Sequence, residues 1–315
     1  MVAAAVTAGA LAVSCRPEPG LGSVSFVRRG ATHVVDLTTC RERVVPGTNS
    51  RTELVSGDRR WAAAIRSSGR GTTAKQTIWV TNLRTHASRP VFSETQYYKQ
   101  IGPGETAGPI VLLGWSGDDR WIFFSIDPGG SGSIQADGLT LRVVSASGGR
   151  ARPLARMLLY PDYLAWCGGR LVFTAGTDRI ATNNKRLLVA APPDWRPRRL
   201  VAAPGRAWGS LACARHGRAI VVQSQTASND ARFFATHWAL WHVGFDGSRR
   251  RLTAPPPGYA DESPRFSPDG RALLFVRSHN GVGKAYALRN RRLLGPLLSL
   301  GYSLGFYGHQ HWWAD

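Results

Sequence analysis

The sequence has few cysteines, no long apolar run and no helical period, and each shortage excludes a class of protein. Its 4 cysteines form no Cys-x-x-Cys pair, which excludes the usual ligand spacing of a structural zinc site. The only candidate membrane segment, from Val2 to Val13, is too short to cross a bilayer as a helix. Apolar residues nowhere recur with a long helical period, so the sequence argues against a helical protein.

What the sequence does contain is glycine, proline and short apolar segments. With 35 Gly, 19 Pro and 43% hydrophobic residues in 315, the chain is globular and rich in turns. Its length exceeds the usual size of a single core, unless the fold grows by adding units that contact only their neighbours. The composition therefore agrees with one large all-β domain.

The segment Ser263–Val276 predicts two short strands joined by a strongly specified turn. Its Ser267-Pro-Asp-Gly270 sequence has type I turn chemistry, in which the proline presets φ and the glycine accepts a positive φ. An alternating strand is expected to follow from Ala272 to Val276.

Degenerate copies of this hairpin recur upstream, and each ends its turn with an arginine. These arginines lie 60, 50, 48 and 53 residues apart. That spacing is expected for one four-stranded propeller blade with variable loops. The copies are Ser56–Ile65, Ser116–Phe124, Trp166–Phe173 and Cys213–Val222, and the arginines are Arg60, Arg120, Arg170, Arg218 and Arg271.

A second hairpin can be read after each first one, and its outer strand is short and basic. The N-terminal region adds three further strands, Val24–Val27, His33–Leu37 and Arg41–Val45, without an obvious innermost strand. The sequence therefore predicts an all-β, six-bladed β-propeller of four-stranded antiparallel blades. The third strands of the other blades are expected at Thr77–Leu83, Leu139–Val144, Arg186–Ala190, Trp238–Val243 and Lys284–Leu288.

Two segments compete for the missing innermost strand of the first blade. Tyr307–Asp315 resembles the innermost strand and turn entry of the other blades, and we expect this C-terminal strand to close the ring. The alternative is Ala12–Arg16, because Val13-Ser-Cys-Arg16 resembles Leu211-Ala-Cys-Ala-Arg215.

The hairpin at 263–276 resembles the short repeat of TolB-like propellers, which belong to the wider group of tryptophan-aspartate-like (WD40-like) repeat proteins. Consistent hairpin pairs extend the resemblance over residues 21–315. It implies a six-bladed propeller that usually lies outside the cytoplasm and binds protein or peptide ligands through one face. It implies no chemistry, because propellers include binding modules, lyases, hydrolases and peptidase lids.

The sequence predicts two parts. Residues 1–15 are a possible truncated signal or lipoprotein-type segment, and residues 16–315 are the single propeller domain. Val2–Val13 suits the apolar part of a signal peptide, although no Lys or Arg precedes it. Ala10-Leu-Ala12 fits a cleavage site, whereas Leu11–Cys15 partly matches a lipoprotein box that would anchor a lipid through Cys15. We expect an envelope or secreted location. The alternative is an artefactual or structural N-terminus.

The four cysteines allow three pairings if all are oxidised. Cys167 and Cys213 are expected at the ends of innermost strands in consecutive blades, so a disulfide between them would connect neighbouring blades. Closing a loop of about 46 residues would stabilise the fold by roughly 3 to 4 kcal/mol. Two buried free thiols are the alternative.

The formal net charge of +20 suggests anionic partners, and only 4 of the 40 basic residues are lysine. Many arginines fall on the expected outer strands, where charge prevents edge-to-edge pairing. Aromatic residues do not alternate with them in an RNA-binding pattern, so nucleic acid is not favoured. Weak binding to anionic envelope polymers is retained as a possibility, and a monomer is expected.

Catalytic motifs fail on their context, and no catalytic residue or cofactor is predicted. Gly301-Tyr-Ser-Leu-Gly305 matches a nucleophile elbow, which needs a strand-turn-helix and then an acid and a histidine downstream, but the sequence ends ten residues later. His309 and His311 alternate onto one strand face and are the candidates for a metal site, with ordinary hydrogen-bonded histidines as the alternative.

Long loops with aromatic residues are expected on one face of the propeller, where function concentrates. They include Ser93–Pro109, Gln223–His237 and Pro255–Ser263. Aromatic loops supply contact area for a protein or peptide partner, so we predict a non-catalytic binding propeller. The alternative is a metal-assisted lyase or hydrolase that acts on an extracellular polysaccharide. The predicted partner-binding residues are Tyr97, Tyr98, Phe233, Phe234, His237, Tyr259 and Tyr307.

Overall fold

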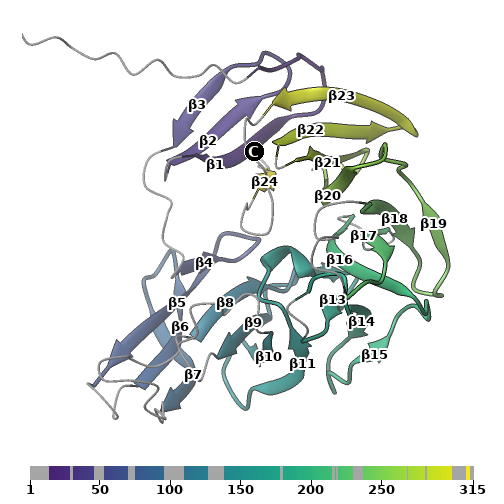
Figure 1. The fold of residues 1–315 in the computed structure, drawn as a ribbon. Helices are drawn as coiled ribbons and strands as arrows, with labels where there is room; N and C mark the ends of the chain where they lie inside the picture. The colour runs from purple at the N-terminus through teal and green to yellow at the C-terminus, as the bar shows by residue number, and fades with distance from the viewer. Residues whose placement is uncertain are drawn as a thin grey trace, which may run out of the picture.

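Six four-stranded antiparallel sheets stand around a common centre in the computed structural model (Figure 1). Each sheet is one blade, so the predicted all-β, six-bladed propeller is confirmed. The 3-10 turn η2 (Pro161–Tyr163) is the only helical element in the described residues. The structure describes residues 14–28, 31–45, 53–69, 75–95, 110–126, 138–177, 180–214, 217, 219–229, 237–267, 269–280, 282–299 and 310–312.

The strands of each blade are given from the innermost to the outermost position. Blade 1 contains β24 (Gln310–Trp312), β1 (Ser23–Arg28), β2 (Ala31–Asp36) and β3 (Glu42–Val45). Blade 2 contains β4 (Glu53–Val55), β5 (Trp61–Ser68), β6 (Lys75–Asn82) and β7 (Ser88–Thr95). Blade 3 contains β8 (Ile110–Trp115), β9 (Trp121–Ile126), β10 (Leu139–Ser145) and β11 (Arg152–Met157).

The remaining three blades follow the same order without interruption. Blade 4 contains β12 (Leu164–Cys167), β13 (Arg170–Ala175), β14 (Arg186–Ala190) and β15 (Arg198–Arg199). Blade 5 contains β16 (Arg206–Cys213), β17 (Ile220–Thr226), β18 (Ala239–Val243) and β19 (Arg249–Arg251). Blade 6 contains β20 (Tyr259–Phe266), β21 (Ala272–His279), β22 (Val282–Arg289) and β23 (Arg292–Ser299).

The first hairpin of blade 6 is held by the side chains of its turn. The Ser267 hydroxyl donates to Asp269 at 2.6 Å and accepts from the backbone N–H of Ala272 at 2.9 Å. Gly270 has φ of +70°, which glycine adopts without strain. These hydrogen bonds satisfy polar groups of the turn that would otherwise bind water, and they fix the residue at which β21 begins.

The same serine–aspartate turn recurs in blades 2 and 3, in the copies predicted at Ser56–Ile65 and Ser116–Phe124. Ser56 donates to Asp58 at 2.7 Å, and Ser116 donates to Asp118 at 2.5 Å. The left-handed position that Gly270 takes in blade 6 is taken here by Arg59, with φ of +58°, and by Asp119, with φ of +56°.

Hydrophobic clusters join neighbouring blades pairwise, as the nearest-neighbour logic of a repeat fold requires. Blades 2 and 3 share a cluster with Ile78 and Phe124, and blades 3 and 4 share one with Phe123 and Phe173. Further clusters contain Val172 and Trp208 in blades 4 and 5, Leu240 and Phe275 in blades 5 and 6, and Leu274 and Phe26 in blades 6 and 1.

Both ends of the described chain contribute to the junction of the first and last blades. β24 pairs antiparallel with β1 and supplies the innermost strand of blade 1, as expected from the C-terminal sequence. Cys15 does not take that position, because it forms an isolated antiparallel bridge with Leu298 on the outermost strand of blade 6. The interpretation of Ala12–Arg16 as an innermost strand is therefore wrong for its described residues.

All four cysteines are paired. Cys167 and Cys213 form the predicted disulfide between blades 4 and 5, and Cys15 and Cys40 form a second one. A lipid thioether needs the same sulfur atom of Cys15 that bonds to Cys40. Lipid anchoring through Cys15 and this disulfide therefore exclude one another.

Parts of three expected loops are strands. β7 continues to Thr95, β17 continues to Thr226, and Tyr259 begins β20. In the described residues, no helix has the length and apolar character needed to cross a membrane.

Candidate functional site

Tyr259, His279 and His237 meet where the chain enters the innermost strand of blade 6. The rings of Tyr259 and His279 stack with centroids 4.3 Å apart, and the backbone N–H of His237 donates to the Tyr259 carbonyl at 3.2 Å. We call this side of the ring the crossing face, because Leu164, Arg206 and Tyr259 begin the inner strands β12, β16 and β20 there. The stacked pair is a partly exposed aromatic surface on that face.

The hydrogen bonds of His279 hold its ring in place and define its tautomer. Nδ1 lies 3.0 Å from the Gly258 carbonyl, so Nδ1 carries the proton and donates. Nε2 accepts from the amide nitrogen of Asn280 at 3.1 Å. The ring is therefore fixed beneath Tyr259 and is preorganised for contact.

Glu262 lies three residues further along β20 and is surrounded by protein, although it retains partial solvent contact. Burial raises the pKa of Glu262 to about 7, the charges of Asp162 and Asp261 act in the same direction, and the hydrogen bond from Ser278 opposes them. Among the described residues no basic side chain pairs with Glu262. A carboxyl of this kind can take or release a proton near neutral pH.

Asp162 in η2 brings a second carboxylate to the same region, and Arg265 on β20 brings a cation. Burial lowers the pKa of Arg265, whereas Asp162 raises it. The guanidinium of Arg265 donates to the carbonyls of Pro264 at 2.8 Å and Leu211 at 3.4 Å. The inner strands of blades 5 and 6 and the turn before β12 therefore assemble a charged cluster from distant parts of the sequence.

β16 and β20 each contain a bulge, and the bulges determine the direction in which these side chains point. The register shifts between Trp208 and Leu211 in β16 and between Glu262 and Arg265 in β20. The backbone N–H of Ser263 in one bulge donates to Ser210 in the other at 3.1 Å. A bulge re-aims a side chain and strengthens local twist. The hydrogen bond between the two bulges fixes the inner strands of blades 5 and 6 relative to one another.

Asp261 and Arg277 form a buried ion pair beside Glu262. Asp261 is 0% exposed, and its two oxygens accept from Nε and Nη2 of Arg277 at 2.7 and 2.9 Å. This bond raises the pKa of Arg277. The pair neutralises Asp261 and fixes the backbone from which Glu262 projects.

The structure tests the placement of few predicted site residues. His237 and Tyr259 lie together, joined by the hydrogen bond between their backbones. His311 lies in β24, and only its backbone is described. Tyr97, Tyr98, Phe233, Phe234, Tyr307 and His309 lie outside the described residues.

Sequence reasoning missed Asp162, Glu262, Arg265 and His279. A signal was present for one of them, because Asp261 and Glu262 are adjacent acidic residues in a chain with 20 Asp and Glu against 40 Lys and Arg. Acidic residues in a strand next to a strong repeat motif indicate a buried partner or a binding role.

Metal binding finds no support in the described part of the chain, where no three His, Cys, Asp or Glu side chains gather closely enough to hold an ion. The residues predicted for such a site, His309 and His311, have no described side chains. They remain a prediction.

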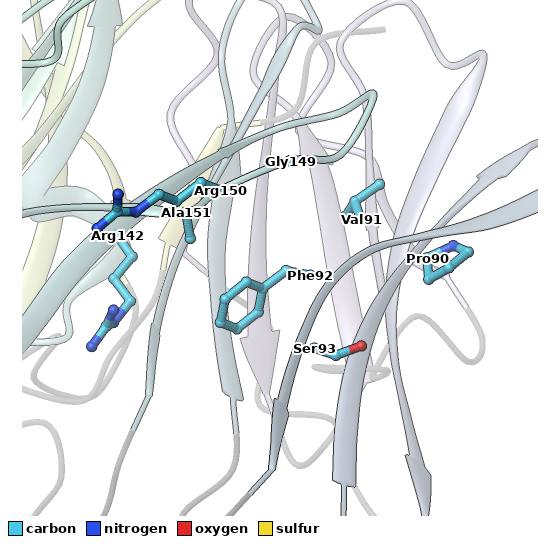
Figure 2. A pocket seen from close by; sticks show the side chains of 8 residues that line it. All are labelled: Pro90, Val91, Phe92, Ser93, Arg142, Gly149, Arg150 and Ala151. Carbon is cyan, nitrogen blue, oxygen red and sulfur yellow. The ribbon is translucent and has the colours of Figure 1, made fainter.

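Other pockets are lined by residues outside the crossing-face cluster. A groove of about 470 Å³ separates Pro90, Val91 and Phe92 on β7 from Arg142 and Arg150 of blade 3. Figure 2 shows the Phe92 ring between the two arginines and Pro90. A smaller pocket of about 220 Å³ lies between blades 4 and 5 and is lined by basic residues, including Arg186, Arg199 and Arg206.

Comparison with solved structures identifies the fold. The chain is similar to TolB from Acinetobacter baumannii, with 14% identity and a TM-score of 0.50 over 89% of this chain and 64% of that one. It is also similar to a putative TolB from Agrobacterium tumefaciens, with 15% identity and a TM-score of 0.51 over 93% of this chain and 100% of that one. A puromycin hydrolase matches with 14% identity and a TM-score of 0.50 over 92% of this chain and 45% of that one.

These similarities show a TolB-like propeller fold, as the repeat predicted. The chain spans 64% of the Acinetobacter TolB and less than half of the puromycin hydrolase. Neither the protein-family models nor the curated protein sequences give a match. Because the fold occurs in a TolB and in a hydrolase, function has to be argued from the site.

Proposed function

We propose that this chain is a non-catalytic binding propeller that takes a protein or peptide segment on its crossing face and receives a basic group of that segment at Glu262. One observation carries the proposal. Glu262, a largely enclosed carboxyl with no basic partner among the described residues, lies on β20 three residues from Tyr259 of the partly exposed Tyr259–His279 stack. A lysine or arginine side chain, or an amino terminus, supplies the missing cation, while the rings supply contact area.

The proposal predicts how the affinity for the bound segment changes with pH. A bound cation favours the charged form of Glu262, so binding releases the proton that burial retains in the free protein. Affinity should therefore rise as the pH increases through about 7. An apolar peptide bound only through the aromatic surface would lack this dependence.

A location outside the cytoplasm belongs to the same proposal. Two disulfides use all four cysteines, and structural disulfides persist mainly in oxidising compartments. A TolB-like fold is compatible with an envelope or secreted protein.

Site-specific photo-crosslinking in a native envelope extract tests the proposal. In one variant a photoreactive residue replaces His237, which is exposed beside Tyr259. In the other it replaces Arg84, an exposed residue in the turn after β6, at the end of that strand away from the crossing face. We expect His237 to capture one protein or peptide that Arg84 does not capture. The substitution Glu262→Gln, which keeps an acceptor for Ser278, should reduce that capture and remove its pH dependence.

Equal capture from both positions would reject a binding site on the crossing face. Capture from His237 that is unchanged by Glu262→Gln would reject the role of the carboxyl. The enzymatic alternative, a metal-assisted lyase or hydrolase, has its own test. Stoichiometric transition metal in the purified protein, lost on replacing His309 and His311, would favour that alternative.

A further inference from the structure

A pocket of about 220 Å³ lies between blades 4 and 5 on the crossing face. One wall contains Lys185, which precedes β14, and Arg186, which begins β14, and another is the start of β16, with Arg206 and Trp208. Arg199 of β15 lies at the outer side. Three separate elements therefore contribute basic side chains to one small volume.

The charge of this pocket has one sign. Lys185, Arg186, Arg199 and Arg206 line it, and within the part of the chain that the structure describes no aspartate or glutamate does. Lys185 is only 1% exposed, and its ammonium donates to the carbonyls of Ile180 at 3.0 Å and Asn183 at 2.9 Å. These bonds hold the ammonium in the wall of the pocket.

Arg206 is held in place as well. Its Nε donates to the Ser224 hydroxyl at 3.0 Å, and its guanidinium lies 4.4 Å from the ring centroid of Trp241. Burial lowers the pKa of Arg206, and the nearby charges of Arg249 and Arg251 lower it further. Ser224 and Trp241 are both neutral, so the half-buried charge of Arg206 has, among the described residues, only like charges near it. A bound anion would offset this repulsion.

Size and charge together define the anion. The volume is below the roughly 300 Å³ of a typical small-molecule site, so the pocket admits a group and not a whole molecule. A carboxylate has two oxygens, and one bidentate arginine satisfies it. Arginines from β14, β15 and β16 instead suit a tetrahedral oxyanion with oxygens on several sides and more than one negative charge.

We propose that this pocket binds a phosphoryl group, as free phosphate or as the head group of a larger molecule. The groove at Arg142 and Arg150 is a weaker candidate, because apolar side chains form much of its lining and, among the residues that the structure describes, two arginines are its only charged residues. The phosphoryl site uses no residue of the Tyr259, His279 and Glu262 site. The proposal is therefore independent of the proposed peptide-binding function.

Calorimetric titration with inorganic phosphate and with glycerol phosphate tests the site at low ionic strength. Flotation with phosphatidylglycerol vesicles, compared with phosphatidylcholine vesicles, tests a lipid source. The variant Arg186→Gln/Arg199→Gln changes two exposed residues whose side chains form no hydrogen bond or ion pair within the described part of the chain, and it should therefore fold. We expect it to weaken binding about tenfold or more, because each charge-assisted hydrogen bond contributes substantially.

A matched variant, Arg84→Gln/Arg292→Gln, removes the same charge at exposed positions in blades 2 and 6. It should retain the affinity within about twofold, since it leaves the pocket unchanged. Thermal unfolding confirms that both variants are folded. Binding of free phosphate assigns a soluble source, and binding only of phosphatidylglycerol vesicles assigns a lipid head group. Equal loss in both variants, loss in neither, or no binding of any probe would overturn the proposal.

Discussion

Asp119 accepts a hydrogen bond from the backbone N–H of Gly57 at 2.8 Å, across the boundary between blades 3 and 2. Its second oxygen accepts from the N–H of Asp58 at 3.1 Å. The turn of one blade is therefore capped by the turn of the next, 62 residues later in the sequence. Because a propeller is stabilised by contacts between neighbours, such bonds decide how rigidly adjacent blades are held.

Replacing Asp119 should reveal this cap. Asp119→Ala removes both hydrogen bonds and leaves alanine at φ of +56°, so we expect the free energy of unfolding to fall by about 2 kcal/mol. Asp119→Asn retains an acceptor, and asparagine tolerates this φ, so the free energy of unfolding should fall by less. Urea unfolding measures both.

Arg59 provides the control, because it takes the equivalent left-handed position in blade 2 with φ of +58°. Arg59→Gly relieves that φ and should stabilise the protein by up to about 1 kcal/mol. If Asp119→Gly stabilises the protein equally, backbone strain and not the cap determines the effect at Asp119.

Glu262 should make stability depend on pH. The pKa of its folded form, about 7, lies above the unfolded value of 4.5, so folding favours the protonated carboxyl. This contribution is present below pH 4.5 and is lost as the pH rises through about 7. Glu262→Gln should therefore be more stable than the wild type above this window and should lose the advantage below it.

The measurement is the free energy of unfolding on both sides of that window. Each pKa unit corresponds to about 1.4 kcal/mol before the partial solvent contact of the side chain reduces it. Glu53→Gln removes a charge from an exposed position on β4 and serves as the comparison. Parallel pH profiles for Glu262→Gln and the wild type would contradict the prediction.

The buried pair of Asp261 and Arg277 should be costly to break from one side. Asp261→Ala leaves the half-buried guanidinium of Arg277 without its bidentate partner, and we expect a loss of about 3 to 5 kcal/mol. Adding Arg277→Met removes the unpaired charge and should recover a large part of the loss. A double-mutant cycle in urea measures the coupling, and additive losses would show that the two side chains act independently.

The blade framework was predictable from local sequence because its turns carry their own hydrogen bonds. Ser267 and Asp269 specify the hairpin of blade 6 within four residues, and the strand expected at Ala272–Val276 is observed as Ala272–His279. The third strand expected at Arg186–Ala190 has those bounds in the structure. Such signals need no information from distant parts of the chain.

The inner strand β20 was partly mistaken for a loop, and the reason is physical. Asp261, Glu262 and Ser263 are polar, and the proline that follows is uncommon in strands. In the folded chain their partners are Arg277, Ser278 and Ser210, at sequence separations of 16, 16 and 53. Only the tertiary structure brings these partners together, so local pattern did not show that β20 begins at Tyr259 or which side chains surround Glu262.

The disulfide of Cys15 and Cys40 should fasten the junction of the last and first blades. Cys15 bridges Leu298, the N–H of Arg16 donates to the Leu297 carbonyl at 2.8 Å, and the N–H of Ser299 donates to the Ser14 carbonyl at 2.9 Å. The N-terminal segment therefore pairs with blade 6 while its cysteine is bonded to blade 1. Cys15→Ser should release the segment, lower the free energy of unfolding by about 3 kcal/mol and speed amide exchange at Ser299.

Cys213→Ser separates this local effect from a general loss of stability. It removes the other disulfide, which joins blades 4 and 5, and should also lower the free energy of unfolding. Under native conditions it should leave exchange at Ser299 slow, because that amide opens with the N-terminal segment and not with blade 5. Hydrogen exchange read at Ser299 in both variants decides the matter: equal acceleration would mean that the Cys15–Cys40 bond has no particular hold on the blade junction.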